Sequence, residues 1–334
     1  MAAIALGGVA LVSAPAGAHA STTDQVTIVT DSAGIPHITA ASYAALGYGE
    51  AYAFAADDFC TLAEDFVTVN GERSKYFGAT GLAVDYANGS AETNLESDMF
   101  WQSVKDSGLF AKETSAPPPV GPIPQVRQLY GGYVEGYNAY LASGKLNDPA
   151  CAGKPWVRPI TLQDMFLRMA QIVTEGSSGD LIPYETAAAP PASASPSVSS
   201  SDATGSRVPP DAATLRDLRE NGGASNGSNG VAVGSQDTRA GDGMVLANPH
   251  YPWEGPDRFW MAQLTLPGGY NVEGGTLMGF PLIGIGFNSS VSWTHTDSTT
   301  EHFTFYQLKL VPGDPTSYYV DGKATPMGRM TVTV

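Results

Sequence analysis

A low-complexity segment divides the chain into two parts that must fold on either side of it. Residues 187–213 read AAAPPASASPSVSSSDATGSRVPPDAA and carry almost no large apolar side chain. Such a segment cannot bury enough apolar surface to offset the conformational entropy lost on folding. We therefore expect residues 187–213 to be poorly ordered and protease-sensitive, within a spacer at 187–227 that separates a first part at 21–186 from a second part at 228–334.

The two parts differ in their hydrophobic periodicity. Residues 25–40 in the first part have the alternation of strands, interrupted by a turn at Asp31–Gly34. Apolar side chains at helical spacing then predict helices over 42–68, 122–142 and 161–175. Thr161 and Asp164 are typical of a helix start. The second part has strand signals separated by glycine turns at 231–233, 244–246, 259–266 and 303–310. The chain is therefore predicted to be an α+β protein.

Composition and charge exclude several classes of protein and partner. Hydrophobic residues make up 43% of the 334 positions, which argues against a mostly disordered chain. The chain has 33 acidic and 17 basic residues, for a net charge of −16. Such a surface repels phosphate, so we expect neither nucleic acid nor an anionic membrane as a partner.

The N-terminus predicts export. Residues 2–13 are apolar and uncharged, and Ala18-His19-Ala20 matches the A-x-A pattern of a signal-peptidase site. We expect residues 1–20 to be a signal peptide and the protein to be secreted or periplasmic. The basic segment that usually opens a signal peptide is missing, so the alternative is an ordinary buried apolar N-terminus.

Two cysteines limit the covalent options. Cys60 and Cys151 are too few for a disulfide-dense scaffold or a four-cysteine zinc site. They could form one bridge in an oxidising compartment or remain two separate buried thiols, because sequence separation does not decide between these states.

A Gly-Ser step and a histidine are the candidates for chemistry. Gly227-Ser228 joins the spacer to the strand signal at 231–233, within the stretch NGGASNGSNG. One interpretation is a flexible turn. The other is self-cleavage, in which the Ser228 hydroxyl attacks the uncrowded Gly227 carbonyl, and the new N-terminal amine then serves as general base. His250 ends the strand-like run LANPH, where it could cap the strand or take part in acid–base chemistry.

Several motifs resemble one family. The stretches SNGV at 228–231, GMVLANPH at 243–250 and WTHT at 293–296 resemble the start of the β-chain of penicillin acylase-type N-terminal nucleophile hydrolases. They are most similar to the branch of acyl-homoserine lactone acylases and aculeacin-type lipopeptide acylases. In the first part, VTI with GIPHI at 26–38 and GERS with YFG at 71–78 resemble α-chain motifs.

The resemblance implies an αββα four-layer sandwich of two stacked sheets between helices. Residues 21–186 would be the helix-rich α-chain region, and residues 228–334 the N-terminal part of the β-chain. The chain would be a zymogen that yields an αβ heterodimer on cleavage. The family's second oxyanion donor is an asparagine beyond the position of residue 334, so we expect a fold that is incomplete at the C-terminus.

The resemblance also implies roles for individual residues. Ser228 would be the nucleophile, because His250 lies 22 positions downstream as in this branch, whereas the same spacing does not fit Ser225. His250 would contribute to the site beside the Ser228 amine, and Asp297 would give a backbone N–H to the oxyanion hole. Tyr251, Phe259, Leu277 and Ile285 would bind the acyl chain, although each could equally be core packing; Asn229 and Arg258 are candidate orienting groups.

The expected reaction is hydrolysis of the amide bond in an N-acylated small molecule of the penicillin, acyl-homoserine lactone or lipopeptide type, with roles such as antibiotic biosynthesis or quorum quenching. No organic cofactor is needed. Asp297 and Glu301 are weak calcium candidates, because two carboxylates do not make the six to eight oxygens that calcium prefers. The alternatives are an inactive truncated remnant that at most binds acyl compounds, and an unrelated secreted β-rich binding protein. Cleavage at Gly227-Ser228 would distinguish the acylase from the inactive remnant and from the unrelated binding protein.

Overall fold

A computed structural model describes residues 25–83, 92–175, 178–188, 213, 227–296, 304 and 306–334. The predicted signal peptide and nearly all of the spacer at 187–227 lie outside these residues.

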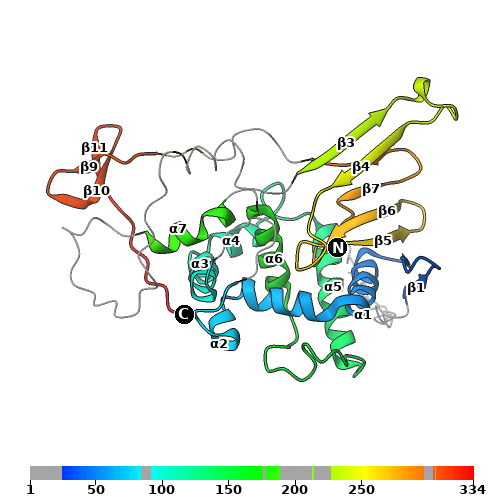
Figure 1. The fold of residues 1–334 in the computed structure, drawn as a ribbon, viewed down its shortest axis with the longest axis horizontal. Helices are drawn as coiled ribbons and strands as arrows, with labels where there is room; N and C mark the ends of the chain where they lie inside the picture. Colours follow the sequence, from blue (N-terminus) through cyan, green and yellow to red (C-terminus); the bar gives the residue numbers. More distant parts are fainter. Residues whose placement is uncertain are drawn as a thin grey trace, which may run out of the picture.

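The described elements follow the predicted order, with a pair of strands first, then helices, then strands again (Figure 1). The first part contains β1 (Val26–Thr30), β2 (Pro36–Ala40), α1 (Tyr43–Val69), α2 (Arg73–Phe77), α3 (Asn94–Asp106), α4 (Leu109–Ser115), α5 (Pro124–Ala142), α6 (Leu162–Thr174) and α7 (Ile182–Ala187). The second part contains β3 (Ser228–Val233), β4 (Met244–Pro249), β5 (Phe259–Leu266), β6 (Tyr270–Leu277), β7 (Ile285–Phe287), β8 (Ser292–Trp293), β9 (Leu310–Val311), β10 (Asp314–Val320) and β11 (Lys323–Pro326). The α+β prediction is confirmed.

Local signals explain most of these bounds. Helix α6 begins where predicted, because the Thr161 hydroxyl accepts from the Asp164 N–H while the Asp164 carboxylate accepts from the Thr161 N–H. The turn between β1 and β2 is closed by the Asp31 carboxylate, which accepts from the N–H groups of Ala33 and Ile35. One strand prediction is wrong: at 303–310 the described residues 306–309 are irregular, and strand structure begins at β9.

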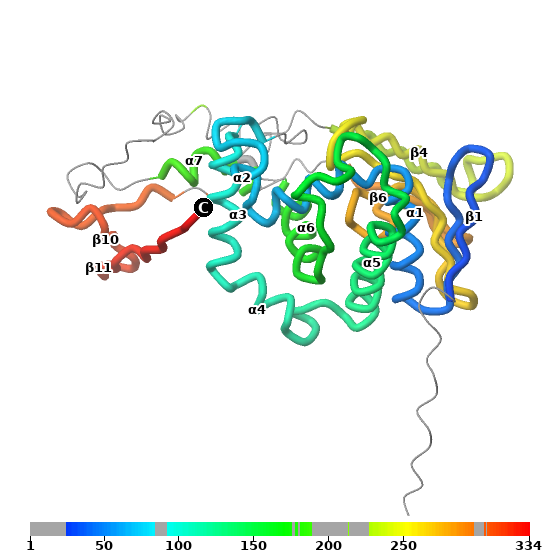
Figure 2. The backbone as a smooth tube through the Cα atoms, turned by 90° about the horizontal axis from the view of Figure 1, so that it is seen from below, coloured from blue at the N-terminus to red at the C-terminus, as the bar shows by residue number. Residues whose placement is uncertain are grey.

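A six-stranded sheet joins the two parts of the chain. Its order is β1-β2-β5-β6-β7-β8, and β2 of the first part pairs in parallel with β5 of the second. Helix α1 packs against β1, β2 and β5 of this sheet, and α5 packs against α1 (Figure 2). Of the four expected layers, the described residues therefore form one layer of helices and one main sheet. The β3–β4 hairpin and the β9–β11 sheet are separate.

Helices α1 and α5 approach closely because glycines line their contact. A Cβ at Gly132 or Gly136 would collide with the backbone of α1, and one at Gly47 would collide with the Leu129 carbonyl on α5. The buried aromatic side chains Phe59, Tyr133 and Tyr137 fill the space along this pair of helices.

Two further observations concern covalent and membrane structure. Cys60 and Cys151 form a disulfide with a Cα–Cα distance of 5.4 Å, which ties α1 to the loop before α6. Over the described ranges, no helix is both long and apolar enough to cross a membrane.

Candidate active site

The β3–β4 hairpin brings Ser228 and His250 together. The strands pair antiparallel with Ser228 opposite Pro249, so His250 follows directly beside the start of β3. Ser228 is half-buried and His250 is exposed. The pairing of β3 with β4 thus brings together two residues that lie 22 positions apart in the sequence.

The Gly227 carbonyl receives two hydrogen bonds at this point. The Ser228 hydroxyl donates to the Gly227 oxygen at 2.7 Å, and the His250 backbone N–H donates to the same oxygen at 2.9 Å. The nucleophile candidate is therefore in contact with the peptide group that it would attack, and a second donor polarises that group.

The His250 ring is oriented by Asn248. The Asn248 amide nitrogen lies 3.2 Å from Nε2 of His250, an arrangement in which the amide donates and the imidazole accepts. The Nδ1 atom faces Gly227, because a Cβ on that glycine would lie 3.5 Å from it.

The segment after β8 (Ser292–Trp293), which leads to the predicted oxyanion donor, passes beside β3. A Cβ at Gly230 would lie 2.9 Å from Cγ2 of Thr294 and 3.7 Å from Cγ2 of Thr296. The Trp293 indole N–H donates to the Gly284 carbonyl at 2.9 Å and fixes the start of this segment. Asp297 and Glu301 lie outside the described residues, so their oxyanion and calcium roles stay predictions.

Three of the four predicted acyl-binding residues lie on neighbouring strands. Phe259 opens β5 and pairs with Leu277 at the end of β6, while Ile285 on β7 pairs with Gly275. Tyr251 follows His250 and packs edge-on against Phe259, with ring centroids 5.3 Å apart. The four side chains range from half-buried to buried. The structure thus gathers an apolar group next to His250.

Arg258 is held by a contact that the sequence does not reveal. The backbone of α1 leaves helical geometry at Asp58, whose carboxylate pairs with Arg258 of the second part. The adjacent Asp57 accepts from the Trp260 indole N–H at 2.8 Å. Arg258 therefore orients the start of β5. Its partner lies 200 positions away in the sequence, which is why no local pattern predicts it.

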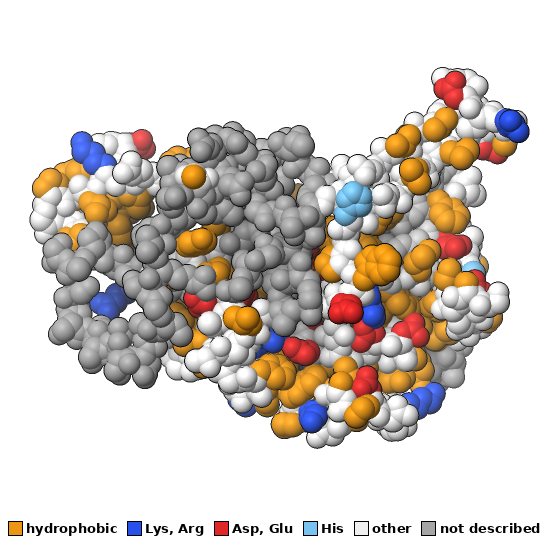
Figure 3. All heavy atoms as spheres, in the orientation of Figure 1, with side chains coloured by type: hydrophobic (Ala, Val, Ile, Leu, Met, Phe, Trp, Pro, Cys, Tyr) orange, Lys and Arg blue, Asp and Glu red, His pale blue; other side chains and the backbone are white. Residues whose placement is uncertain are grey.

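The surface near the site is apolar. Val231, Met244 and Leu246 on the β3–β4 hairpin are each more than half exposed. In the space-filling view, hydrophobic side chains follow the projecting hairpin (Figure 3). A cavity of about 380 Å³ lies elsewhere, lined by residues of α1, α3, α6 and 254–256. Across the described segments, no group of three or more His, Cys, Asp or Glu side chains is arranged to hold a metal ion.

Comparison with known proteins gives a consistent result. The family model for penicillin amidase matches residues 25–334. Aculeacin-A acylase of Actinoplanes utahensis is 42% identical over 307 residues, covering 90% of this chain and 37% of the relative. The acyl-homoserine lactone acylase PvdQ of Pseudomonas putida strain KT2440 is 41% identical over 303 residues, with the same two coverages.

The chain spans little more than a third of the length of these relatives. Among solved structures, a thermostable penicillin G acylase from Alcaligenes faecalis matches with 22% identity and a TM-score of 0.34. That match covers 45% of this chain and 72% of the acylase chain.

Proposed function

The chain belongs to the penicillin amidase family, and we propose that it contributes to an acylase that uses Ser228 as an N-terminal nucleophile. The observation that carries this proposal is the Gly227 carbonyl, which accepts from both the Ser228 hydroxyl and the His250 backbone N–H. Its named relatives are acylases for aculeacin A and acyl-homoserine lactones, which supports an amide of a fatty acyl chain as substrate class.

The first step is cleavage of the chain by its own serine. The Ser228 oxygen attacks the Gly227 carbonyl carbon, the C–N bond breaks as the acyl group moves to oxygen, and the nitrogen takes up a proton. Water then hydrolyses the ester, which leaves a Gly227 carboxylate and a free Ser228 amine. The His250 N–H stabilises the charge that develops on the carbonyl oxygen.

The same serine then acts on substrate. Its α-amine, with a usual pKa of about 8, removes the proton of its own hydroxyl, which attacks the amide carbonyl of the substrate. The substrate amine leaves with a proton, and water releases the acyl group as a carboxylate. Tyr251, Phe259, Leu277 and Ile285 would contact the acyl chain.

We further propose that the protein works outside the cytoplasm. The disulfide between Cys60 and Cys151 is typical of oxidising compartments, and it supports the export signal predicted at residues 1–20.

The test is hydrolysis of a series of fluorogenic fatty-acyl amides from hexanoyl to tetradecanoyl. The chain extended to the length of its relatives should release the fluorophore, and Ser228→Ala in that form should not, because the variant lacks the attacking oxygen. The 334-residue chain should release it very slowly or not at all. If the extended form hydrolyses none of the series, the acylase proposal is wrong.

A further inference from the structure

Arg168 is a buried cation that the proposed chemistry does not use. It lies on α6, and its side chain is 0% exposed. Its Nε lies 3.2 Å from the Asp65 carboxylate on α1, and its Nη1 donates to Gln171 at 2.9 Å. Gln171 in turn donates to Asp65 at 2.9 Å. The first part of the chain therefore holds this guanidinium in a fixed orientation.

The other contacts of Arg168 cross to the second part of the chain. Its Nη2 donates to the Pro256 carbonyl at 2.8 Å, and its Nε donates to the Met278 carbonyl at 3.0 Å. The Asp257 carboxylate lies 3.7 Å from Nη2. Gly279 packs on the aliphatic stem, because a Cβ there would lie 3.0 Å from Cγ of Arg168.

These contacts lie at one end of the β5–β6 hairpin. Pro256 and Asp257 come just before β5, and Met278 comes just after β6. At this end Phe259 pairs with Leu277, which are two of the residues predicted to bind the acyl chain. The Arg168 side chain therefore contacts the ends of both β5 and β6, next to the predicted acyl-binding residues Phe259 and Leu277.

We propose that Arg168 is a positioning residue that holds the end of the β5–β6 hairpin carrying Phe259 and Leu277 in place and thereby sets the acyl-chain preference, an inference that rests on the proposed function. The planar guanidinium offers donors in fixed directions, so it reaches two carbonyls and two carboxylates at once. An ammonium group keeps the charge but lacks this geometry, which makes Arg168→Lys the informative variant.

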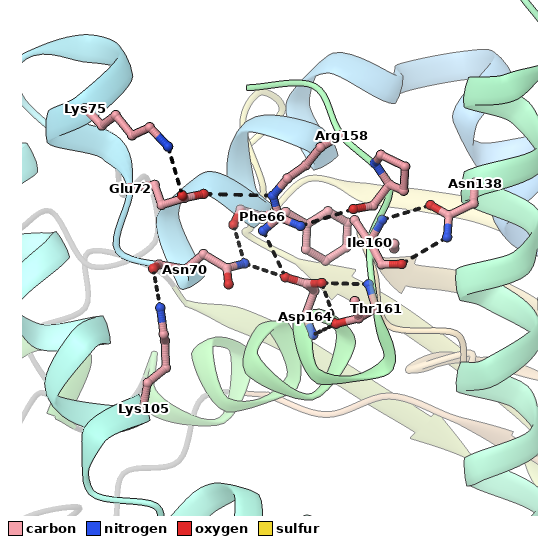
Figure 4. Close-up of polar contacts among 11 residues, drawn as sticks. Phe66, Asn70, Glu72, Lys75, Lys105, Asn138, Arg158, Ile160, Thr161 and Asp164 are labelled. Carbon is pink, nitrogen blue, oxygen red and sulfur yellow. Dashed lines mark hydrogen bonds and ion pairs between the residues drawn. The ribbon is translucent and has the colours of Figure 1, made fainter. Parts of the chain in front are cut away.

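The chain offers a matched control. Arg158 is bonded to Asp164 at 3.2 Å and lies 3.8 Å from Glu72, and these partners, like Arg158, belong to the first part (Figure 4). Arg158→Lys makes the same chemical change in an acidic setting without touching the β5–β6 hairpin. Asp257→Asn is a milder variant that removes one charge from the hairpin side alone.

The first measurement is amide hydrogen exchange on the full chain. With Arg168→Lys, amides at 257–260 and 276–279 should exchange about tenfold faster or more, while the turn at 266–270 changes little. Asp257→Asn should give an intermediate effect at the same amides, and Arg158→Lys none. Unchanged exchange with Arg168→Lys, or equal acceleration by both lysine variants, overturns the inference.

The second measurement uses the fatty-acyl amide series on whichever length of chain is active. Arg168→Lys should raise KM for the best substrate about tenfold and flatten the chain-length preference, with kcat within about threefold of wild type. An unchanged chain-length preference despite faster exchange overturns the link to the acyl site. If wild-type protein hydrolyses nothing, the proposed function fails instead, and the exchange result still decides whether Arg168 holds the hairpin.

Discussion

At the level of single residues, the Gly227 carbonyl is the group on which the proposed chemistry converges. A serine hydroxyl and a backbone N–H both point at its oxygen, and the second donor is His250, the residue directly after β4. The His250 N–H is fixed by the hairpin register, so it needs no rearrangement when negative charge develops on that oxygen. Residue 227 should therefore be sensitive to any side chain that alters the approach of Ser228.

The cleavage rates of two Gly227 variants should show how large a side chain the attack by Ser228 tolerates at this position. A Cβ at this position would meet Nδ1 of His250 at an ordinary 3.5 Å, so Gly227→Ala should be cut at a rate within about threefold of wild type. The branched methyl groups of Gly227→Val crowd the serine and should slow cleavage about tenfold or more. A time course of the intact mass measures both rates, and a valine variant cut as fast as wild type would show that crowding at residue 227 does not limit the attack.

At the level of elements, α1 connects the helical layer to the sheet and to the site. Its break at Asp58 provides the carboxylate for Arg258, and Asp57 holds Trp260, so the two residues that flank Phe259 are both fixed by the helix. Nearer its start, α1 buries Glu50, which is 1% exposed. The Oε2 atom of Glu50 has no hydrogen-bond partner in the described part of the chain.

Glu50 should make the stability of the fold depend on pH. Burial raises the pKa of this carboxyl well above its usual value, and its charge would also face the hydroxyls of Tyr130 and Tyr133 on α5 and Tyr270 on β6. Because the folded state binds this proton more tightly than the unfolded state, stability is highest below the unfolded pKa of about 4.3 and is lost as pH rises through the folded pKa.

Replacing Glu50 with glutamine should remove this loss. Glu50→Gln imitates the protonated acid and has no proton to lose, so the free energy of unfolding at pH 8 should rise by about 1 kcal/mol or more, since each unit of pKa shift is worth about 1.4 kcal/mol. The gain should vanish near pH 4. Urea denaturation at both pH values measures it, and Glu135→Gln, an exposed glutamate on α5, is the control. A gain that is equal at both pH values would refute the assignment of the effect to ionisation.

At the level of the whole molecule, the main sheet is built from both sides of the spacer. Strands β1 and β2 precede the spacer and β5 to β8 follow it, with the parallel β2–β5 pair at the junction. The buried contacts of Arg168 and the Asp58–Arg258 pair cross the same boundary. Cleavage after Gly227 would therefore leave two segments held together by a common sheet.

The sequence predicted the features that residues a few positions apart determine, such as helix starts and turns. The Thr161 and Asp164 pattern located the start of α6, and the Asp31 turn located the β1–β2 hairpin. A similar capping pattern at Thr93 and Glu96 begins α3 and could have predicted that helix as well. Contacts between distant segments were out of reach, because nothing near Arg258 in the sequence indicates Asp58, and nothing near Arg168 indicates Met278.

The N-terminal sequence of the smaller fragment formed from the purified chain tests the nucleophile assignment. If Ser228 cuts the chain, the fragment begins SNGVAVG, and Ser228→Ala remains a single chain that is not cut between residues 227 and 228. A fragment that begins SNGSNG would move the nucleophile to Ser225 and contradict the assignment, as would a Ser228→Ala variant that is still cut between residues 227 and 228.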